Sequence, residues 1–171
     1  GGGWYRSDVQ VTLSANDATS GVAGTQYRID GGSWQNYGGA FTVSGDGSHT
    51  VEYRSTDVAG NTESTRSQTV QIDTTPPATA HTLSGTLGNG GWYRSNVQVT
   101  LNASDNASGM SNTQCRVDGG SWQNYGGAFT VSSEGNHTVE YRSTDVAGNQ
   151  ESVRSCTFNV DTVAPDTTHS L

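Results

Sequence analysis

The chain has 171 residues, with 16 acidic against 8 basic side chains and a formal net charge of -8. An acidic surface is repelled by phosphate backbones and anionic lipid headgroups, so neither nucleic-acid binding nor membrane-surface binding is expected. No apolar run approaches the roughly 18 residues that a membrane helix needs, so membrane insertion is not expected either.

The composition favours an all-β fold. Only 30% of the residues are apolar and 14% are charged. Gly, Ser, Thr, Asn and Asp fill the remainder, and the apolar residues are mostly Val, Ile, Tyr, Trp and Phe in alternating runs. This pattern distinguishes the chain from a disordered one and is typical of short strands joined by turns.

The sequence contains an internal repeat with a period of 88 residues. The run EYRSTDVAGN occurs at Glu52–Asn61 and again at Glu140–Asn149 (140 − 52 = 88). Self-similarity over a domain-sized period indicates tandem copies of one folding unit. We therefore predict one repeat over 1–75, whose first strand is missing or supplied from upstream, and a second over 76–163. Residues 164–171 would begin a following repeat or form an exchangeable strand.

Alternation predicts the strands of the first copy, and Gly-rich turns separate them. The next strand, Thr79–Gly85, would open the second copy. About seven short strands in each period are the number expected for an Ig-like or fibronectin-III-like β-sandwich. The predicted strands of the first copy are Asp8–Ala15, Thr25–Asp30, Ser33–Tyr37, Ala40–Ser44, His49–Asp57 and Ser67–Asp73.

The period-two pattern also assigns the side chains to faces. On each strand the apolar residues occupy alternate positions, so they should form the core between two sheets. Arg28, Glu52 and Arg54 would face water and could form weak cross-strand ion pairs. The predicted core of the first copy consists of Val9, Val11, Leu13, Tyr27, Ile29, Val51, Tyr53, Val70 and Ile72.

Two cysteines, Cys115 and Cys156, occur only in the second copy, where they replace Tyr27 and Gln68. Because both positions change together, we predict a disulfide, which suits an extracellular compartment. In an ordinary Ig-like order, however, a third strand would separate them by roughly 9–10 Å, which is beyond bridging range. The alternative is two buried thiols that act as small apolar residues.

The repeated DVAGN segment allows two interpretations. As a turn, its Asp accepts hydrogen bonds from the amides that follow, and its Gly and Asn tolerate a left-handed backbone. As a calcium site, carboxylates and an Asn amide oxygen would supply hard ligands. In a sandwich the loop containing Asp105 and the linker containing Asp73 should approach it. The candidate calcium ligands are Asp57, Asn61, Asp73, Asp105, Asp145 and Asn149.

Aromatic residues follow a Gly-Gly hairpin in each copy: Trp34 and Tyr37, with Trp122 and Tyr125. In a small sandwich such residues often cover the open edge of the core. The alternative is stacking against a glycan. Sequons at Asn102, Asn106 and Asn136 are compatible with surface loops.

No catalytic signature is present. The sequence lacks a GxSxG, an HExxH and a phosphate-binding Gly loop, and no His has a Ser or Cys partner at a recognisable catalytic spacing. We therefore predict that the protein is not an enzyme and requires no cofactor, with calcium as the one candidate ion.

Three features together resemble the bacterial Ig-like repeat domains of large secreted and surface-anchored proteins: the strand start His49-Thr50-Val51, the D-x-A-G-N turn and the D-T-x-x-P linker at Asp73. The resemblance covers nearly the whole chain. It implies extracellular spacing and adhesion, with calcium at domain junctions in some relatives, where Asp73, Asp145 and Asn149 match the pattern.

Our functional prediction is a non-enzymatic structural or spacer module of a repetitive bacterial surface fibre, filament or adhesin, secreted or at the cell surface. Its expected partners are neighbouring copies of the same repeat, and host or matrix glycans are a further candidate. The alternative is a carbohydrate-binding accessory module of a secreted glycoside hydrolase, for which Trp34 and Trp122 would have to be exposed.

Overall fold

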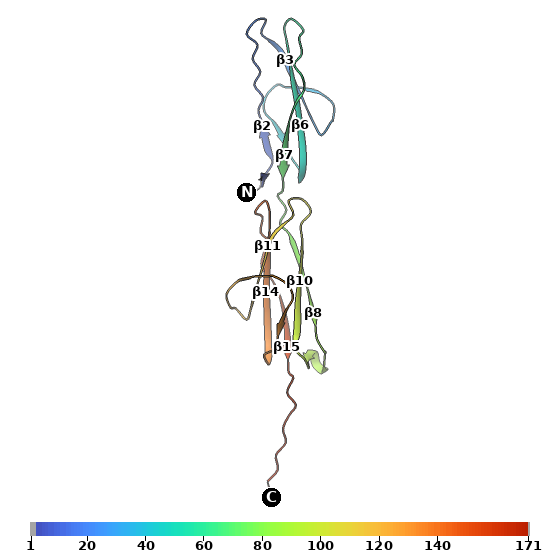
Figure 1. Cartoon of the computed structure of the whole chain (residues 1–171), viewed down its shortest axis with the longest axis vertical. Helices are drawn as coiled ribbons and strands as arrows, with labels where there is room; N and C mark the ends of the chain where they lie inside the picture. Colours follow the sequence, from blue (N-terminus) through green and yellow to red (C-terminus); the bar gives the residue numbers. More distant parts are fainter. Residues whose placement is uncertain (1–2, 171) are drawn as a thin grey trace. The chain divides into compact units, whose positions relative to one another are not determined.

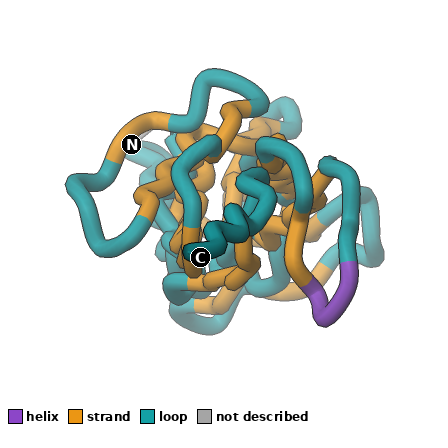
Figure 2. The backbone as a smooth tube through the Cα atoms, turned by 90° about the horizontal axis from the view of Figure 1, so that it is seen from below, coloured by secondary structure: helices purple, strands orange, loops and turns teal. Residues whose placement is uncertain are grey.

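The computed structural model describes residues 3–170, so Gly1, Gly2 and Leu171, which fall in the predicted segments 1–75 and 164–171, lie outside the described residues. The described part consists of strands, turns and loops with one short 3-10 turn, η1 (Asn89–Gly91), drawn in purple in Figure 2. The described part of the chain contains no helix that is long and apolar enough to cross a membrane. The all-β prediction is confirmed.

The chain divides into two compact units, which we call unit 1 and unit 2. Unit 1 contains residues 1–75 together with the turn 146–149, and unit 2 contains residues 76–145 and 150–171. In unit 1 a five-stranded sheet has the order β1-β7-β6-β3-β4, and a second sheet pairs β2 with β5. Its strands are β1 (Trp4–Tyr5), β2 (Val9–Val11), β3 (Val22–Ile29), β4 (Gln35–Asn36), β5 (Phe41–Val43), β6 (Gly47–Asp57) and β7 (Arg66–Ile72).

Unit 2 repeats this arrangement with one additional strand. Its five-stranded sheet has the order β12-β11-β14-β15-β9, and its second sheet has the order β13-β10-β8. Figure 1 shows β8 and β10 side by side. The extra strand, β8, pairs with β10. The strands of unit 2 are β8 (Ala78–Ser84), β9 (Trp92–Tyr93), β10 (Val97–Ser104), β11 (Met110–Val117), β12 (Gln123–Asn124), β13 (Phe129–Val131), β14 (Gly135–Asp145) and β15 (Arg154–Val160).

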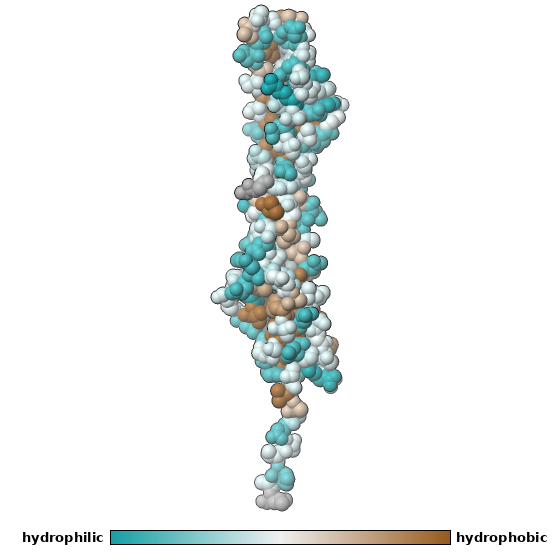
Figure 3. Space-filling view, viewed as in Figure 1, coloured by the Kyte–Doolittle hydropathy of each residue, from teal (hydrophilic) through white to brown (hydrophobic). Residues whose placement is uncertain are grey.

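Each unit has its own apolar core between its two sheets, built from alternate strand positions. Of the predicted core residues of unit 1, Leu13 and Tyr27 lie outside this core, and the others belong to it. In unit 1 the buried centre is Val43, Val51, Val70 and Ile72, with Val9, Val11, Ile29, Phe41 and Tyr53 packed partly buried against it. The core of unit 2 contains Val97, Val99, Leu101, Cys115, Val131, Val139, Tyr141, Cys156, Phe158 and Val160. Hydrophilic and neutral residues cover most of the visible surface of each unit (Figure 3).

The solvent-facing charges also follow the prediction. Arg28 on β3 lies opposite Glu52 on β6 and donates two hydrogen bonds to its carboxylate, at 2.8 and 2.9 Å. Arg116 and Glu140 repeat the pair in unit 2 with the same two distances. Because these pairs are solvent-accessible, screening by water keeps the contribution of each pair to stability small.

Two predicted strands are shorter than expected. The strand predicted over residues 8–15 ends at Val11, whereas its counterpart β10 continues from Val97 to Ser104. In unit 2, β10 pairs with β8 along that whole length. In unit 1 no strand among residues 3–170 pairs with the chain beyond Val11, and an extended segment without a partner forms no ladder. The strand predicted over 33–37 is likewise reduced to β4.

Candidate functional site

The principal site is a groove beside the second sheet of each unit, which in unit 2 is filled by β8. There the Thr79 amide donates to Glu151 Oε2 at 3.2 Å, and the Thr79 hydroxyl bonds both Glu151 and Ser143. Arg154 donates to the Thr79 carbonyl at 2.9 Å. Two residues further along β8, His81 Nδ1 lies 2.8 Å from the Tyr141 hydroxyl.

The side chains that hold β8 have identical counterparts in unit 1. Tyr53, Ser55, Glu63 and Arg66 lie 88 residues before Tyr141, Ser143, Glu151 and Arg154. In unit 1 they line an open groove of about 670 Å³, together with Leu13 and the chain that follows it. The two units therefore show the same groove with and without a strand in it.

Burial follows this difference. Tyr141 and Ser143 are 3% and 0% exposed, whereas Tyr53 and Ser55 are only half-buried. Glu151 is 8% exposed, whereas Glu63 is exposed. A buried carboxylate is costly unless it is hydrogen-bonded, and in unit 2 Thr79 of β8 supplies those bonds to Glu151. The unit 1 groove thus retains hydrogen-bonding groups that suit a strand rather than an apolar ligand.

The DVAGN segment forms a closed turn in unit 1. Asp57 accepts the Asn61 amide and the Asn61 side-chain nitrogen, each at 2.8 Å. These bonds, that of the Asn61 side chain first, lower the pKa of the Asp57 carboxyl. Gly60 has φ +93°, a left-handed conformation that glycine adopts without strain. The turn interpretation is confirmed for this copy.

In the second copy the turn residues Val146–Asn149 pack within unit 1. Arg6 donates from Nε to the Asn149 side-chain oxygen at 3.0 Å, and Asn149 donates from Nδ2 to the Asp73 carbonyl at 2.8 Å. Asn149 and Asp73 are both buried. The side-chain amide of Asn149 therefore has a structural role of its own, because its oxygen and its nitrogen are both hydrogen-bonded.

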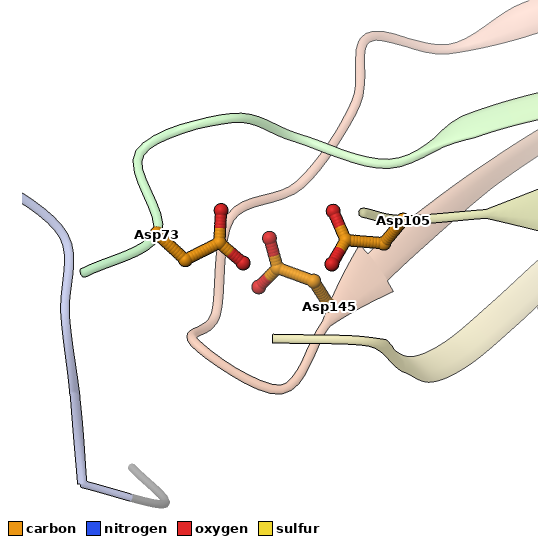
Figure 4. A group of neighbouring side chains, drawn as sticks. All are labelled: Asp73, Asp105 and Asp145. Atoms are coloured by element: carbon orange, nitrogen blue, oxygen red, sulfur yellow. The ribbon is translucent and has the colours of Figure 1, made fainter. Parts of the chain in front are cut away.

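Two of the six candidate calcium ligands lie together in unit 2. Asp105 follows β10 and Asp145 ends β14, and a carboxylate oxygen of one lies within 4.8 Å of a carboxylate oxygen of the other (Figure 4). Asp73 follows β7 and belongs to unit 1. Oxygen ligands of this kind suit a hard cation such as calcium. Asp57 and Asn61 instead close the turn in unit 1, and Asn149 has the contacts described above. Calcium binding stays a prediction.

The predicted disulfide is not formed: Cys115 and Cys156 are free, buried thiols. Cys115 lies on β11 and Cys156 on β15, the two neighbours of β14. Two strand spacings separate them by roughly 9–10 Å, whereas a disulfide needs Cβ atoms about 4 Å apart. The structure agrees with the alternative, in which the two cysteines act as small apolar residues, because both thiols belong to the core of unit 2.

Contrary to the prediction, the tryptophans do not cover the open edge of the core. Trp34 is half-buried, and the guanidinium carbons of Arg28 and Arg54 lie 4.7 and 4.2 Å from the centroid of its ring. Trp122 has the same relation to Arg116 and Arg142, at 4.7 and 4.3 Å. Such cation–π contacts occupy ring surface that a stacked sugar would need. Glycan contact by these residues stays a prediction that this geometry does not favour.

The tyrosines of the same hairpins do serve packing. The Tyr37 hydroxyl accepts the Leu13 amide at 3.0 Å, and its ring meets Phe41 edge-on at 6.3 Å between centroids. Tyr125 repeats both contacts, with Leu101 at 3.0 Å and Phe129 at 6.4 Å. Each ring therefore ties the hairpin loop to the second sheet.

Sequence reasoning missed a Ser-His-Asp arrangement in unit 2. His137 Nδ1 lies 2.8 Å from Asp118 Oδ2, and its Nε2 lies 3.3 Å from the Ser133 hydroxyl. The ring is nevertheless unsuited to act as a base: Nε2 lies closer to the Ser133 carbonyl, at 2.9 Å, so both ring nitrogens face acceptors. A ring that donates from both nitrogens is an imidazolium and cannot accept a serine proton.

This His–Asp pair is instead a structural lock found in both units. The hydrogen bond that His137 donates to Asp118 raises the pKa of His137 despite its burial, and the Thr138 amide and His137 lower the pKa of the Asp118 carboxyl. Asp118 has φ +49°, and the Thr138 amide donates to it at 2.8 Å, which holds this unusual backbone. In unit 1, His49 and Asp30 repeat the arrangement.

The comparisons with known proteins agree with this architecture. A family model described as bacterial Ig-like domain matches residues 5–74 and 93–162. No curated protein matches the sequence. Among solved structures, the chain is similar to the fibronectin(III)-like modules of CbhA from Clostridium thermocellum, at 14% identity and a TM-score of 0.42, covering 98% of this chain and 93% of that one.

It is also similar to the D00-D0 domain of intimin, at 14% identity and a TM-score of 0.43, covering 93% of this chain and 95% of that one. Both similarities are too distant to indicate a function. The two segments matched by the family model cover most of each sandwich unit, although the second begins after β8, and together they span most of the sequence. This chain therefore belongs to the bacterial Ig-like domain family, of which it contains two tandem copies.

Proposed function

We propose that the protein is a non-enzymatic structural module of a secreted or cell-surface bacterial protein, in which repeats complete one another by donating a strand. Bacterial Ig-like domains are in general non-catalytic and suggest a structural or adhesive role on surface or secreted proteins. The observation that carries the proposal is the open groove of unit 1, whose side chains match those that bind β8 in unit 2.

The groove specifies the chemistry of its strand. In unit 2 the residues of β8 that bond the groove are Thr79 and His81, two positions apart and therefore on the same face of the strand. The partly buried Leu83 packs on the same side against the core. A donor for unit 1 consequently needs the pattern Thr-x-His-x-Leu in extended conformation, because its hydroxyl meets Ser55 and Glu63 and its imidazole meets Tyr53.

The tail of this chain carries that pattern. Residues Thr167, His169 and Leu171 lie 88 positions after Thr79, His81 and Leu83. Over 166–170 the tail is exposed and forms no regular structure. Strand addition to an exposed sheet edge supplies main-chain hydrogen bonds for affinity and alternate side-chain contacts for specificity. The partner that we propose is thus a second copy of the chain, whose tail enters the unit 1 groove.

The test separates acceptor from donor. A variant that ends at Val163 retains the groove and lacks the tail, and a synthetic peptide of residues 164–171 supplies the donor. We expect the full chain to self-associate in sedimentation velocity, the shortened variant to remain monomeric, and the peptide to bind the shortened variant saturably. A peptide with His169→Ala should bind more weakly, because it loses the hydrogen bond to Tyr53.

A matched pair of variants locates the binding. Ser55→Leu places a bulky side chain in the groove and should abolish peptide binding, whereas Ser48→Leu changes an exposed residue of the same strand and should leave it intact. Sedimentation that does not change on removing the tail, together with no saturable peptide binding, would overturn strand donation. Family membership and the non-enzymatic assignment would stand in that case, because neither depends on the tail.

A further inference from the structure

A second pocket, in unit 2, lies where Cys115 replaces the Tyr27 of the first repeat; one other lining position also differs, with Val117 in place of Ile29. In unit 1 the Tyr27 ring stacks on Phe41, with centroids 3.7 Å apart and planes at 12°, and meets Tyr37 edge-on at 6.4 Å. Its hydroxyl donates to Gln35 Oε1 at 3.1 Å. Tyr27 thus occupies a place with an aromatic wall on one side and a hydrogen-bond acceptor at its end.

Unit 2 keeps the two aromatic rings that surround this position and lacks the third ring, that of Tyr27. Tyr125 and Phe129 meet at 6.4 Å and 71°, close to the 6.3 Å and 80° of Tyr37 and Phe41. Cys115 lies opposite Gln123, the register in which Tyr27 lies opposite Gln35. The surrounding side chains therefore have not collapsed into the space that the smaller cysteine leaves.

What remains is a pocket of about 540 Å³ lined by Cys115, Gln123, Tyr125, Gly126, Gly127 and Phe129. This volume is within the range of about 300–1,000 Å³ typical of small-molecule sites. Burial raises the pKa of the Cys115 thiol, so the thiol at the pocket remains neutral and apolar. The Gln123 side chain makes no hydrogen bond among the described residues, in contrast to Gln35.

We propose that this pocket binds a small phenolic ligand, whose ring stacks on Phe129 and whose hydroxyl donates to Gln123 Oε1. The ligand would occupy the position of the Tyr27 side chain in the other repeat. Stacking on a preformed aromatic wall favours a flat ring. A site built to pair a hydroxyl discriminates against the analogue that lacks it. The pocket leaves room for a short substituent on the ring.

The probe for the test is p-cresol, which has the shape of the tyrosine side chain, titrated into the full chain and followed by NMR and by calorimetry. For so small a ligand we expect a dissociation constant on the order of 1 mM, with one site per chain. Toluene should bind about fivefold more weakly, because it cannot make the hydrogen bond to Gln123. Gln123→Leu should remove this preference while retaining the binding of both compounds.

The repeat supplies reciprocal variants. Cys115→Tyr restores the ring of unit 1 and should abolish binding, whereas Tyr27→Cys opens the corresponding place and should create a second site. The second variant decides the matter even if the first does not fold. Absence of p-cresol binding to the unmodified chain, undiminished binding to folded Cys115→Tyr, or a stoichiometry that stays at one in Tyr27→Cys would each overturn the proposal.

Discussion

Removing one hydroxyl at the same position of the two grooves should have unequal effects. Ser143 is fully buried, and its hydroxyl bonds both Thr79 of β8 and Thr113 of β11, at 2.6 and 2.8 Å. Ser55 is half-buried, and within the described part of the chain its hydroxyl bonds only the Thr25 hydroxyl, at 2.9 Å. The substitutions Ser143→Ala and Ser55→Ala therefore make the same chemical change at two sites. The sites differ because β8 fills the groove beside Ser143, whereas the groove beside Ser55 is open.

The expected magnitudes follow from these contacts. Two buried hydrogen bonds at about 1 kcal/mol each make Ser143→Ala cost about 2 kcal/mol, and the Thr79 hydroxyl is left with Glu151 alone. Ser55→Ala should cost about 0.5–1 kcal/mol, because water can replace its single bond in the open groove. For a domain of this size, a difference of about 1 kcal/mol corresponds to a shift in melting temperature of about 4–8 °C.

Amide hydrogen exchange measured by NMR can follow the two units separately, through the protection of β14 and of β6. We expect Ser143→Ala to reduce protection in unit 2 by more than Ser55→Ala reduces it in unit 1. Addition of the peptide of residues 164–171 should then make Ser55→Ala as costly as Ser143→Ala. Equal losses in the absence of peptide would refute the idea that the occupied groove, rather than the local sequence, determines the difference.

Three further predictions concern the other features described above. The difference in unfolding free energy between the native chain and His137→Gln should be largest at about pH 4–6.5. It should shrink as the pH rises through the raised pKa of His137, because the imidazolium then loses its charge. Urea unfolding at pH 5.5 and 8.5 measures this difference, and a difference that grows with pH would contradict the prediction. Trp122→Leu should lower stability by about 1 kcal/mol through loss of the contacts with Arg116 and Arg142, and it should change nothing on a glycan array if those contacts are the role of the ring. Calcium should raise the melting temperature of the native chain and not that of Asp145→Asn, measured by calorimetry, and the absence of a rise in the native chain would remove the calcium prediction.

The repeat, the all-β class and the faces of most strands could be predicted from the residues alone. These properties are local: period-two alternation defines which side chains share a face, and a Gly-rich turn marks where a strand ends. Val51 and Tyr53 were placed toward the core and Arg28 toward solvent for this reason, and the DVAGN turn closes through a hydrogen bond that spans only four residues.

Which segments are neighbours depends on the three-dimensional fold. Alternation defines a face and not a neighbour, because strand pairing depends on sheet order and on contacts far apart in the sequence. Cys115 and Cys156 therefore face one core yet lie on either side of β14, and the indole of Trp122 meets guanidinium groups rather than the core edge. For the same reason two nearly identical stretches form a groove that β8 fills in unit 2 and that remains open in unit 1, since the strand that completes a sheet lies outside the segment that forms its edge.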